Sequence, residues 1–160
     1  MTSLRLLGAD ACELDGPTFE AAFRFAGQKC WLIRPDGTPS RTLQAYLDSV
    51  PANAVATSTC LERDVWWRFS LPPVPVALVA TCFKGRVPKA VRNTVGAIAV
   101  GGVAGIHDAD SEWARAFLLH FASLGLDERI VAHANGLRKV EINQLNTLLA
   151  EFDGVTASDV

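Results

Sequence analysis

The hydrophobic pattern of this chain predicts a long helix from Ser111 to Gly125. The large apolar residues of this segment recur every three or four positions, which places them on one face of a helix. They are Trp113, Phe117, Phe121 and Leu124. Ser111 can cap the first turn, and Gly125 can end the last one. We therefore expect a helix that packs against a core along a single face.

Two shorter helices are predicted at residues 40–48 and 143–152. Ser40 and Asn143 can cap their first turns. The apolar face of the first helix consists of Leu43, Tyr46 and Leu47. Residues 153–160 follow the last helix as a tail that we expect to be frayed.

Apolar runs bounded by turn residues predict several strands. These are Cys30–Arg34, a segment around Trp66 and Trp67, Val76–Phe83, bent strands in the Gly-rich stretch Thr94–Ile106, and a short strand after a turn at Gly136. A Pro35-Asp36-Gly37 turn would end the first of them. Three prolines between the second and third strands, Pro72, Pro73 and Pro75, cannot lie inside a central ladder and mark a loop or a sheet edge.

The order of these elements defines the expected fold class. Strands and helices are mixed without regular βαβ alternation, and no internal repeat is visible. We predict a single α+β domain over residues 1–152, built on a mixed or antiparallel sheet with about three helices packed against it. The length of 160 residues is sufficient for one domain with its own core.

The composition is typical of a globular protein without a membrane-spanning segment. Hydrophobic residues make up 49% of the chain and charged residues 20%. Residues 1–16 lack a basic segment followed by a long apolar run, so we expect no signal peptide. The longest apolar stretch, Thr94–Ile106, has 13 residues and contains four glycines, too few and too interrupted to cross a bilayer. We expect a cytoplasmic location.

The charge is distributed unevenly. The net charge is −2, which argues against indiscriminate coating of nucleic acid. Residues 60–92 nevertheless carry six Lys and Arg side chains against two carboxylates, whereas residues 107–160 have a net charge of −5. The middle third is therefore a candidate surface for an anionic partner, because steering follows the local potential.

Metal, redox and nucleotide chemistry find little support in the sequence. The four cysteines contain no CxxC pair, and the three histidines have no partner four positions away. We expect buried, reduced thiols and neither a metal nor a cofactor. The Gly-rich stretch lacks the GxGxxG spacing of a dinucleotide site. A hydrolase using Cys or His would need an ordered nucleophile and base, and no such signature is present.

Three segments, taken in order, resemble the target-recognition region of type II adenine-specific DNA methyltransferases. Residues 64–68, "DVWWR", match an arginine-rich element that ends in paired aromatics, with Val65 where the family usually has proline. Residues 83–93 match a basic segment that ends near an Asn, and residues 135–141, "NGLRKVE", match a Gly-Leu-x-Lys element. The resemblance covers about residues 30–152. It implies a DNA-recognition domain that positions duplex DNA.

The same resemblance implies that catalysis lies elsewhere. A methyltransferase needs a glycine-containing S-adenosylmethionine site and an Asn/Asp-Pro-Pro-Tyr/Phe motif for the flipped adenine, and the chain contains neither. We therefore expect no enzymatic activity from this chain, and a separate methyltransferase catalytic subunit as a possible partner. The oligomeric state is left open.

The expected DNA-binding residues belong to the matched segments. Lysines and arginines would contact phosphates, Arg68 could reach guanine, and Asn93 could reach adenine. The full predicted set is Arg63, Trp67, Arg68, Lys84, Arg86, Lys89, Arg92, Asn93, Arg138 and Lys139. If this segment is a strand, the side chain of either Trp66 or Trp67 faces outward. We expect this outward ring to pack beneath Val76–Phe83 in preference to stacking on Arg68.

A different class of function is also compatible with these features. The chain could be a protein–protein docking module, or a remnant of a restriction–modification enzyme that no longer binds DNA. Its acidic carboxy-terminal third would then face a basic partner. Duplex binding across a range of salt concentrations separates this hypothesis from DNA recognition, because only phosphate contacts give salt-dependent affinity.

Overall fold

A computed structural model describes residues 1–32 and 37–158 of the chain. The chain divides into two compact units, Met1–Cys30 with Pro73–Val160 and Trp31–Pro72. The α+β class predicted from the sequence is confirmed, since the chain combines helices with a mixed four-stranded sheet and a small two-stranded sheet. The separate unit at Trp31–Pro72 was not predicted.

The larger unit is built on a mixed sheet with the strand order β1-β4-β2-β5. These strands are β1 (Glu13–Leu14), β4 (Ala90–Asn93), β2 (Ala77–Ala80) and β5 (Val103–Ile106). β1 runs parallel to β4, and β2 runs antiparallel to both β4 and β5. The predicted strand Val76–Phe83 is divided, because its last residues form β3 (Cys82–Phe83), which pairs instead with β6 (Arg138–Lys139).

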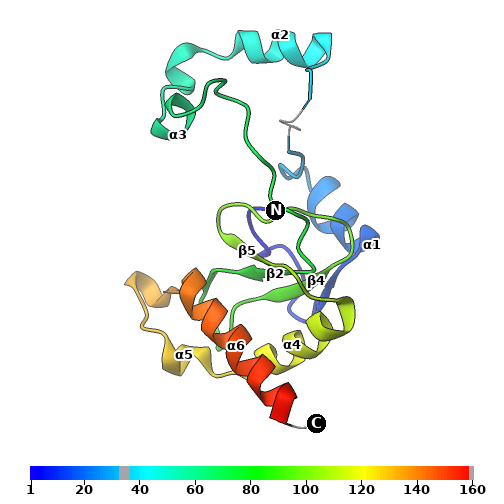
Figure 1. Ribbon diagram of the computed structural model, residues 1–160, viewed down its shortest axis with the longest axis vertical. Helices are drawn as coiled ribbons and strands as arrows, with labels where there is room; N and C mark the ends of the chain where they lie inside the picture. The colour runs from blue at the N-terminus through cyan, green and yellow to red at the C-terminus, as the bar shows by residue number, and fades with distance from the viewer. Residues whose placement is uncertain (33–36, 159–160) are drawn as a thin grey trace. The chain divides into compact units, whose positions relative to one another are not determined.

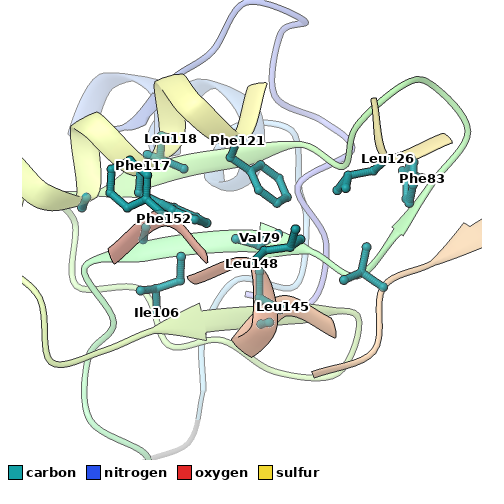
Figure 2. Close-up of a cluster of buried hydrophobic side chains, with 14 of the residues drawn as sticks. Val79, Phe83, Ile106, Phe117, Leu118, Phe121, Leu126, Leu145, Leu148 and Phe152 are labelled. Carbon is teal, nitrogen blue, oxygen red and sulfur yellow. The ribbon is translucent and has the colours of Figure 1, made fainter. Parts of the chain in front are cut away.

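Alternating residues of the sheet enter two different cores. Val79 and Ile106 face α4 (Ser111–Ser123) and α6 (Ile142–Ser158), from which Phe117 and Phe152 point toward the strands (Figure 2). Leu78 on the opposite face packs with the amino-terminal residues. That amino-terminal segment contains α1 (Gly16–Phe19) and a π-helical turn, Glu20–Arg24. The sheet thus lies between two layers (Figure 1).

The predicted apolar stripe of α4 is confirmed. Phe117 and Phe121 are buried, and the Trp113 ring stacks on Phe117 with 5.3 Å between centroids. The cap is one residue earlier than predicted, because Asp110 accepts the hydrogen bond from the Trp113 backbone N–H at 2.8 Å. After α4, a short helix α5 (Leu126–Arg129) and a tight turn (Ala134–Gly136) lead to β6.

The carboxy-terminal helix α6 is longer than predicted and begins earlier. It starts at Ile142, so Asn143 lies inside the helix and is not its cap. It continues to Ser158, so the helix extends over residues 153–158 of the predicted tail, whose last two residues lie outside the described part of the chain. The indole N–H of Trp113 donates to the Asp153 carboxylate at 2.9 Å, and Phe152 is buried, which fixes the late turns of this helix to α4.

The smaller unit consists of short helices. The predicted helix at 40–48 is confirmed as α2 (Arg41–Ser49), with the Ser40 hydroxyl as cap for the Leu43 N–H at 3.2 Å. It is followed by a 3₁₀ turn (Ala52–Ala54) and α3 (Ser58–Leu61). Residues 65–69 form turns and irregular chain, so the strand predicted around the tryptophans is wrong.

The strand predicted at Cys30–Arg34 is only partly within the described residues. Cys30–Leu32 are not in a strand. Ile33 and Arg34, and with them most of the predicted Pro35-Asp36-Gly37 turn, lie outside the described residues. Among the helices in the described part of the chain, none is long and apolar enough to cross a membrane.

Candidate nucleic-acid interface

The two-stranded sheet of β3 and β6 brings together two basic segments that are distant in the sequence. Cys82 lies opposite Lys139, and Phe83 lies opposite Arg138. Phe83 is buried while Cys82 and Lys139 are exposed, so the pair has one inner and one outer face. The exposed turn of residues 84–86 follows β3 directly. We call β3, β6 and residues 84–86 the basic ribbon.

The ribbon has a local structural basis. Asn135 (φ 59°) and Gly136 (φ 70°) both adopt the left-handed conformation, which reverses the chain just before β6. The Val140 N–H then donates to the Thr81 carbonyl at 2.8 Å and extends the pairing. The Nε of Arg138 donates to the carbonyls of Asp127 and Ile130, at 3.2 Å and 3.1 Å, and ties the ribbon to α5.

Two cations of the ribbon are available for a partner. Lys84 and Arg86 are exposed, and within the described chain neither side chain makes a hydrogen bond or an ion pair. Lys139 is exposed as well, but its Nζ lies 2.9 Å from the Glu141 carboxylate. The hydrogen bond that Lys139 donates to the Glu141 carboxylate raises the pKa of Lys139, so this charge is present but partly neutralised.

Three other predicted contacts are engaged inside the protein. The Nζ of Lys89 donates to the carbonyl of Leu7 at 2.7 Å and to that of Gly8. The guanidinium of Arg92 donates to Glu13 at 2.6 Å and to the Ser111 hydroxyl at 2.7 Å. The hydrogen bond with Arg92 lowers the pKa of Glu13, and the same bond raises the pKa of Arg92.

Asn93, the predicted adenine contact, has its amide occupied by the backbone. Its Nδ2 donates to the carbonyl of Pro75 at 2.8 Å and to that of Ala97 at 2.9 Å. Its Oδ1 accepts the Ala97 N–H at 3.0 Å. Recognition of adenine would need the same donor and acceptor, so Asn93 could read a base only after these bonds were broken.

The predicted contacts in the smaller unit form an arginine–aromatic cluster. The Arg68 guanidinium lies over the Trp67 ring, 5.2 Å from its centroid, and the Arg63 guanidinium lies over Phe69 at 5.1 Å. Arg63 also donates to the Trp66 carbonyl at 3.2 Å. The stack of Trp67 on Arg68, one of the two contacts expected for the outward ring, is therefore present within the smaller unit.

A hollow of about 510 Å³ adjoins this cluster. It is lined by Glu62, Arg63, Asp64, Val65, Arg68, Phe69 and Ser70. The carboxylates of Glu62 and Asp64 beside the two arginines reduce the positive potential in the hollow.

Sequence reasoning did not predict a groove on the larger unit. It has a volume of about 900 Å³ and lies between residues 9–13, residues 87–92 and α4. Its walls come from three segments with no shared motif, and Arg115 on α4 had not been singled out. No sequence signal could have identified it, because the groove exists only where these segments pack together.

The remaining predictions concern thiols and metals. All four cysteines are free, as predicted, but none is buried, since Cys12 and Cys82 are exposed and the other two are half-buried. Among the residues that the structure describes, no group of three or more His, Cys, Asp and Glu side chains is arranged to hold a metal ion.

The chain was also compared with known proteins. It matches no protein family, no curated protein and no solved structure. The candidate interface therefore has to be judged on its own geometry.

Proposed function

We propose that this protein is a non-catalytic DNA-recognition module whose basic ribbon contacts the phosphates of duplex DNA. The observation that carries the proposal is the pairing of β3 with β6, which makes neighbours of the basic segments at 84–86 and 138–139. The unpaired cations Lys84 and Arg86 stand at one end of this pair. A two-stranded ribbon fits the major groove of B-DNA, which is about 12 Å wide.

The internal contacts divide the predicted DNA-binding residues into those that can reach DNA and those that support the fold. Lys84, Arg86 and Lys139 supply phosphate contacts, because their side chains reach solvent. Lys89, Arg92 and Asn93 hold β4 in place through their internal contacts, and Arg138 supports the ribbon itself. Arg68, stacked on Trp67, remains the candidate for a base edge, because a stacked guanidinium still has free N–H donors.

Within this proposal, the methyl-transfer chemistry belongs to a separate polypeptide. The resemblance of residues 30–152 to the recognition region of adenine methyltransferases suggests a catalytic subunit as the partner. The module would hold the duplex while that subunit binds the flipped base.

Fluorescence anisotropy with labelled duplex DNA, measured across salt concentrations, tests the proposal. The logarithm of the association constant should fall linearly with the logarithm of the salt concentration. The double variant Lys84→Gln/Arg86→Gln should lower the magnitude of that slope by about 2, since each phosphate contact contributes about 0.9. The matched control is Arg5→Gln/Lys29→Gln, which removes the same charge from exposed positions outside the ribbon.

The outcomes separate the possibilities. A loss of DNA affinity and of its salt dependence that is confined to Lys84→Gln/Arg86→Gln supports the proposal. An equal loss in both variants would mean that only net charge matters, and the absence of binding at every salt concentration would exclude DNA recognition by this chain.

A second candidate function, protein docking, is favoured by the composition of the smaller unit. Leu47 is its one buried large hydrophobic side chain in the described residues, whereas Tyr46 is 57% and Leu61 74% exposed. Apolar side chains left at a surface are typical of interaction sites. If duplex DNA fails to bind, co-elution with a methyltransferase catalytic domain that lacks its own recognition region would support docking.

A further inference from the structure

We propose that the groove between α4, β4 and residues 9–13 binds a small amphipathic anion, with an apolar body on the groove floor and an anionic head at its cationic rim. The site lies within the larger unit and does not depend on DNA binding. Its volume of about 900 Å³ is within the range of roughly 300–1,000 Å³ that is usual for small-molecule sites.

The floor of the groove is apolar. Leu118 and Phe121 of α4 are buried side chains that also belong to the main core, so their positions are fixed. Ala90 and Ala122 also line the groove and add no bulky side chain to it. Leu119 also lines the groove and is 69% exposed, which leaves apolar surface for a ligand to cover.

The rim of the groove is cationic, and two of its cations, Lys89 and Arg92, are held in place. Lys89 is fixed by two backbone carbonyls, which orient the ammonium group without cancelling its charge. Arg92 is fixed by Glu13 and Ser111, and Glu13 neutralises it. Cations whose positions are set before binding cost less entropy to engage than freely rotating ones.

Arg115 supplies the cation that can move to a ligand. It lies on α4 at the groove, is exposed, and makes no hydrogen bond or ion pair with the described residues. Asp10 is the acidic lining residue that remains once Glu13 is paired. The lining therefore has an excess of positive charge, which favours an anionic head group.

The combination of floor and rim favours a small molecule over nucleic acid. Phosphate contacts need cations on an open surface and have no use for a recessed apolar floor. An apolar body with one anionic group matches both parts of the groove at once.

Two fluorescent probes of matched shape test this proposal. Anilinonaphthalene sulfonate has an apolar body and an anionic head, whereas N-phenylnaphthylamine has the same body without the charge. We expect the sulfonate to bind the whole chain with one-to-one stoichiometry. It should also bind more tightly than the neutral amine. Arg115→Gln should weaken the sulfonate roughly tenfold and leave the amine nearly unchanged, because only the charged hydrogen bond is lost.

A steric variant tests the location. Ala122→Trp fills the groove from an exposed helical position, and Ala116→Trp places the same ring on an exposed position of α4 that does not line the groove. The first should abolish sulfonate binding and the second should preserve it. Thermal melts of both variants show whether the fold is intact.

Chemical protection gives a readout that does not depend on fluorescence. Cys12 lines the groove, and Cys82 is an exposed thiol outside it. Bound sulfonate should slow alkylation of Cys12 while leaving Cys82 unchanged, as followed by peptide mass spectrometry.

Three results would overturn the proposal. These are equal affinity for both probes, sulfonate binding that survives Ala122→Trp, and a concentration-dependent dimer that Ala122→Trp abolishes, which would show that a second copy of the chain fills the groove. Because Lys84→Gln/Arg86→Gln leaves the groove untouched, failure of DNA binding and failure of anion binding are separate outcomes.

Discussion

The amide of Asn93 joins β4 to the backbone on either side of it. It bonds to the carbonyl of Pro75, before β2, and to both backbone groups of Ala97, after β4. Three hydrogen bonds from one side chain replace the backbone pairing that these irregular segments lack. Asn93 therefore stabilises the end of the sheet.

Asn93→Asp should lower the free energy of unfolding by about 2 kcal/mol or more, because a carboxylate would face two carbonyl oxygens in place of the two N–H donors. Urea denaturation without DNA measures this. The control Asn143→Asp lies at an exposed position in α6 and should change stability by less than about 0.5 kcal/mol. Equal stability of the wild type and Asn93→Asp would exclude the structural role.

Gly105 in β5 illustrates a second requirement at single-residue scale. A Cβ added there would lie 2.8 Å from the Cβ of Pro75, which is itself buried. A real Cβ does not approach so closely, so only glycine lets Pro75 pack on β5. The Gly-rich composition of residues 94–106 thus has at least one packing reason, unrelated to nucleotide binding.

At the scale of elements, the side chain of Arg92 joins three of them. Arg92 on β4 bonds to Glu13 on β1 and to Ser111 at the start of α4. β1 has only two residues, Glu13 and Leu14, and its parallel pairing with β4 provides few backbone bonds. The side-chain contact therefore contributes to holding β1 in register.

The pH dependence of stability should reveal this contact. Arg92 lowers the pKa of Glu13 in the folded protein below its ordinary value of 4.5, so the ionised carboxylate stabilises the fold above that pH. The contribution is lost as the pH falls through the lowered pKa of the folded state. The stability advantage of wild type over Glu13→Gln should therefore be constant near neutral pH and shrink in acid.

Urea titrations between about pH 2 and pH 7 measure that difference. In an Arg92→Gln background, Glu13→Gln should have a much smaller effect, because the partner that lowers the pKa is gone. An advantage that grows as the pH falls would contradict the assignment.

At the scale of the whole molecule, the two units differ in how much they bury. In the larger unit, α4 buries Ala114, Phe117, Leu118 and Phe121. In the smaller unit, α2 of Arg41–Ser49 buries Leu47. Since helix stability in proteins comes mainly from packing of the apolar face, the smaller unit should open at a lower free energy.

Amide hydrogen exchange should show this difference directly. Peptides from residues 41–49 should exchange orders of magnitude faster than peptides from residues 111–123, because local opening of α2 exposes little apolar surface. Mass spectrometry of the exchanging chain gives both rates in one experiment. Equal protection of the two helices would show that the units unfold together. If a docking partner covers the smaller unit, its addition should slow exchange at 41–49 selectively.

The same three scales explain which features could be predicted from the sequence. The apolar stripe of α4 and the Ser40 cap of α2 were predicted correctly, because both depend on residues within a few positions of one another. The strand around Trp66 and Trp67 was wrong, because apolar and aromatic composition does not determine whether a partner strand is present. The late turns of α6 were not predicted, because Trp113, forty residues away, contacts Asp153.

The sequence by itself therefore determined the α+β class, the main helices and the concentration of positive charge in the middle of the chain, since these depend on composition and on local periodicity. Only the tertiary structure decided which of those charges remain available. Pairing of β3 with β6 leaves Lys84 and Arg86 exposed, whereas packing of β4 against β1 and α4 engages Arg92 with Glu13. A charge is neutralised by the group that lies beside it in space, and in this protein that group comes from a distant part of the chain.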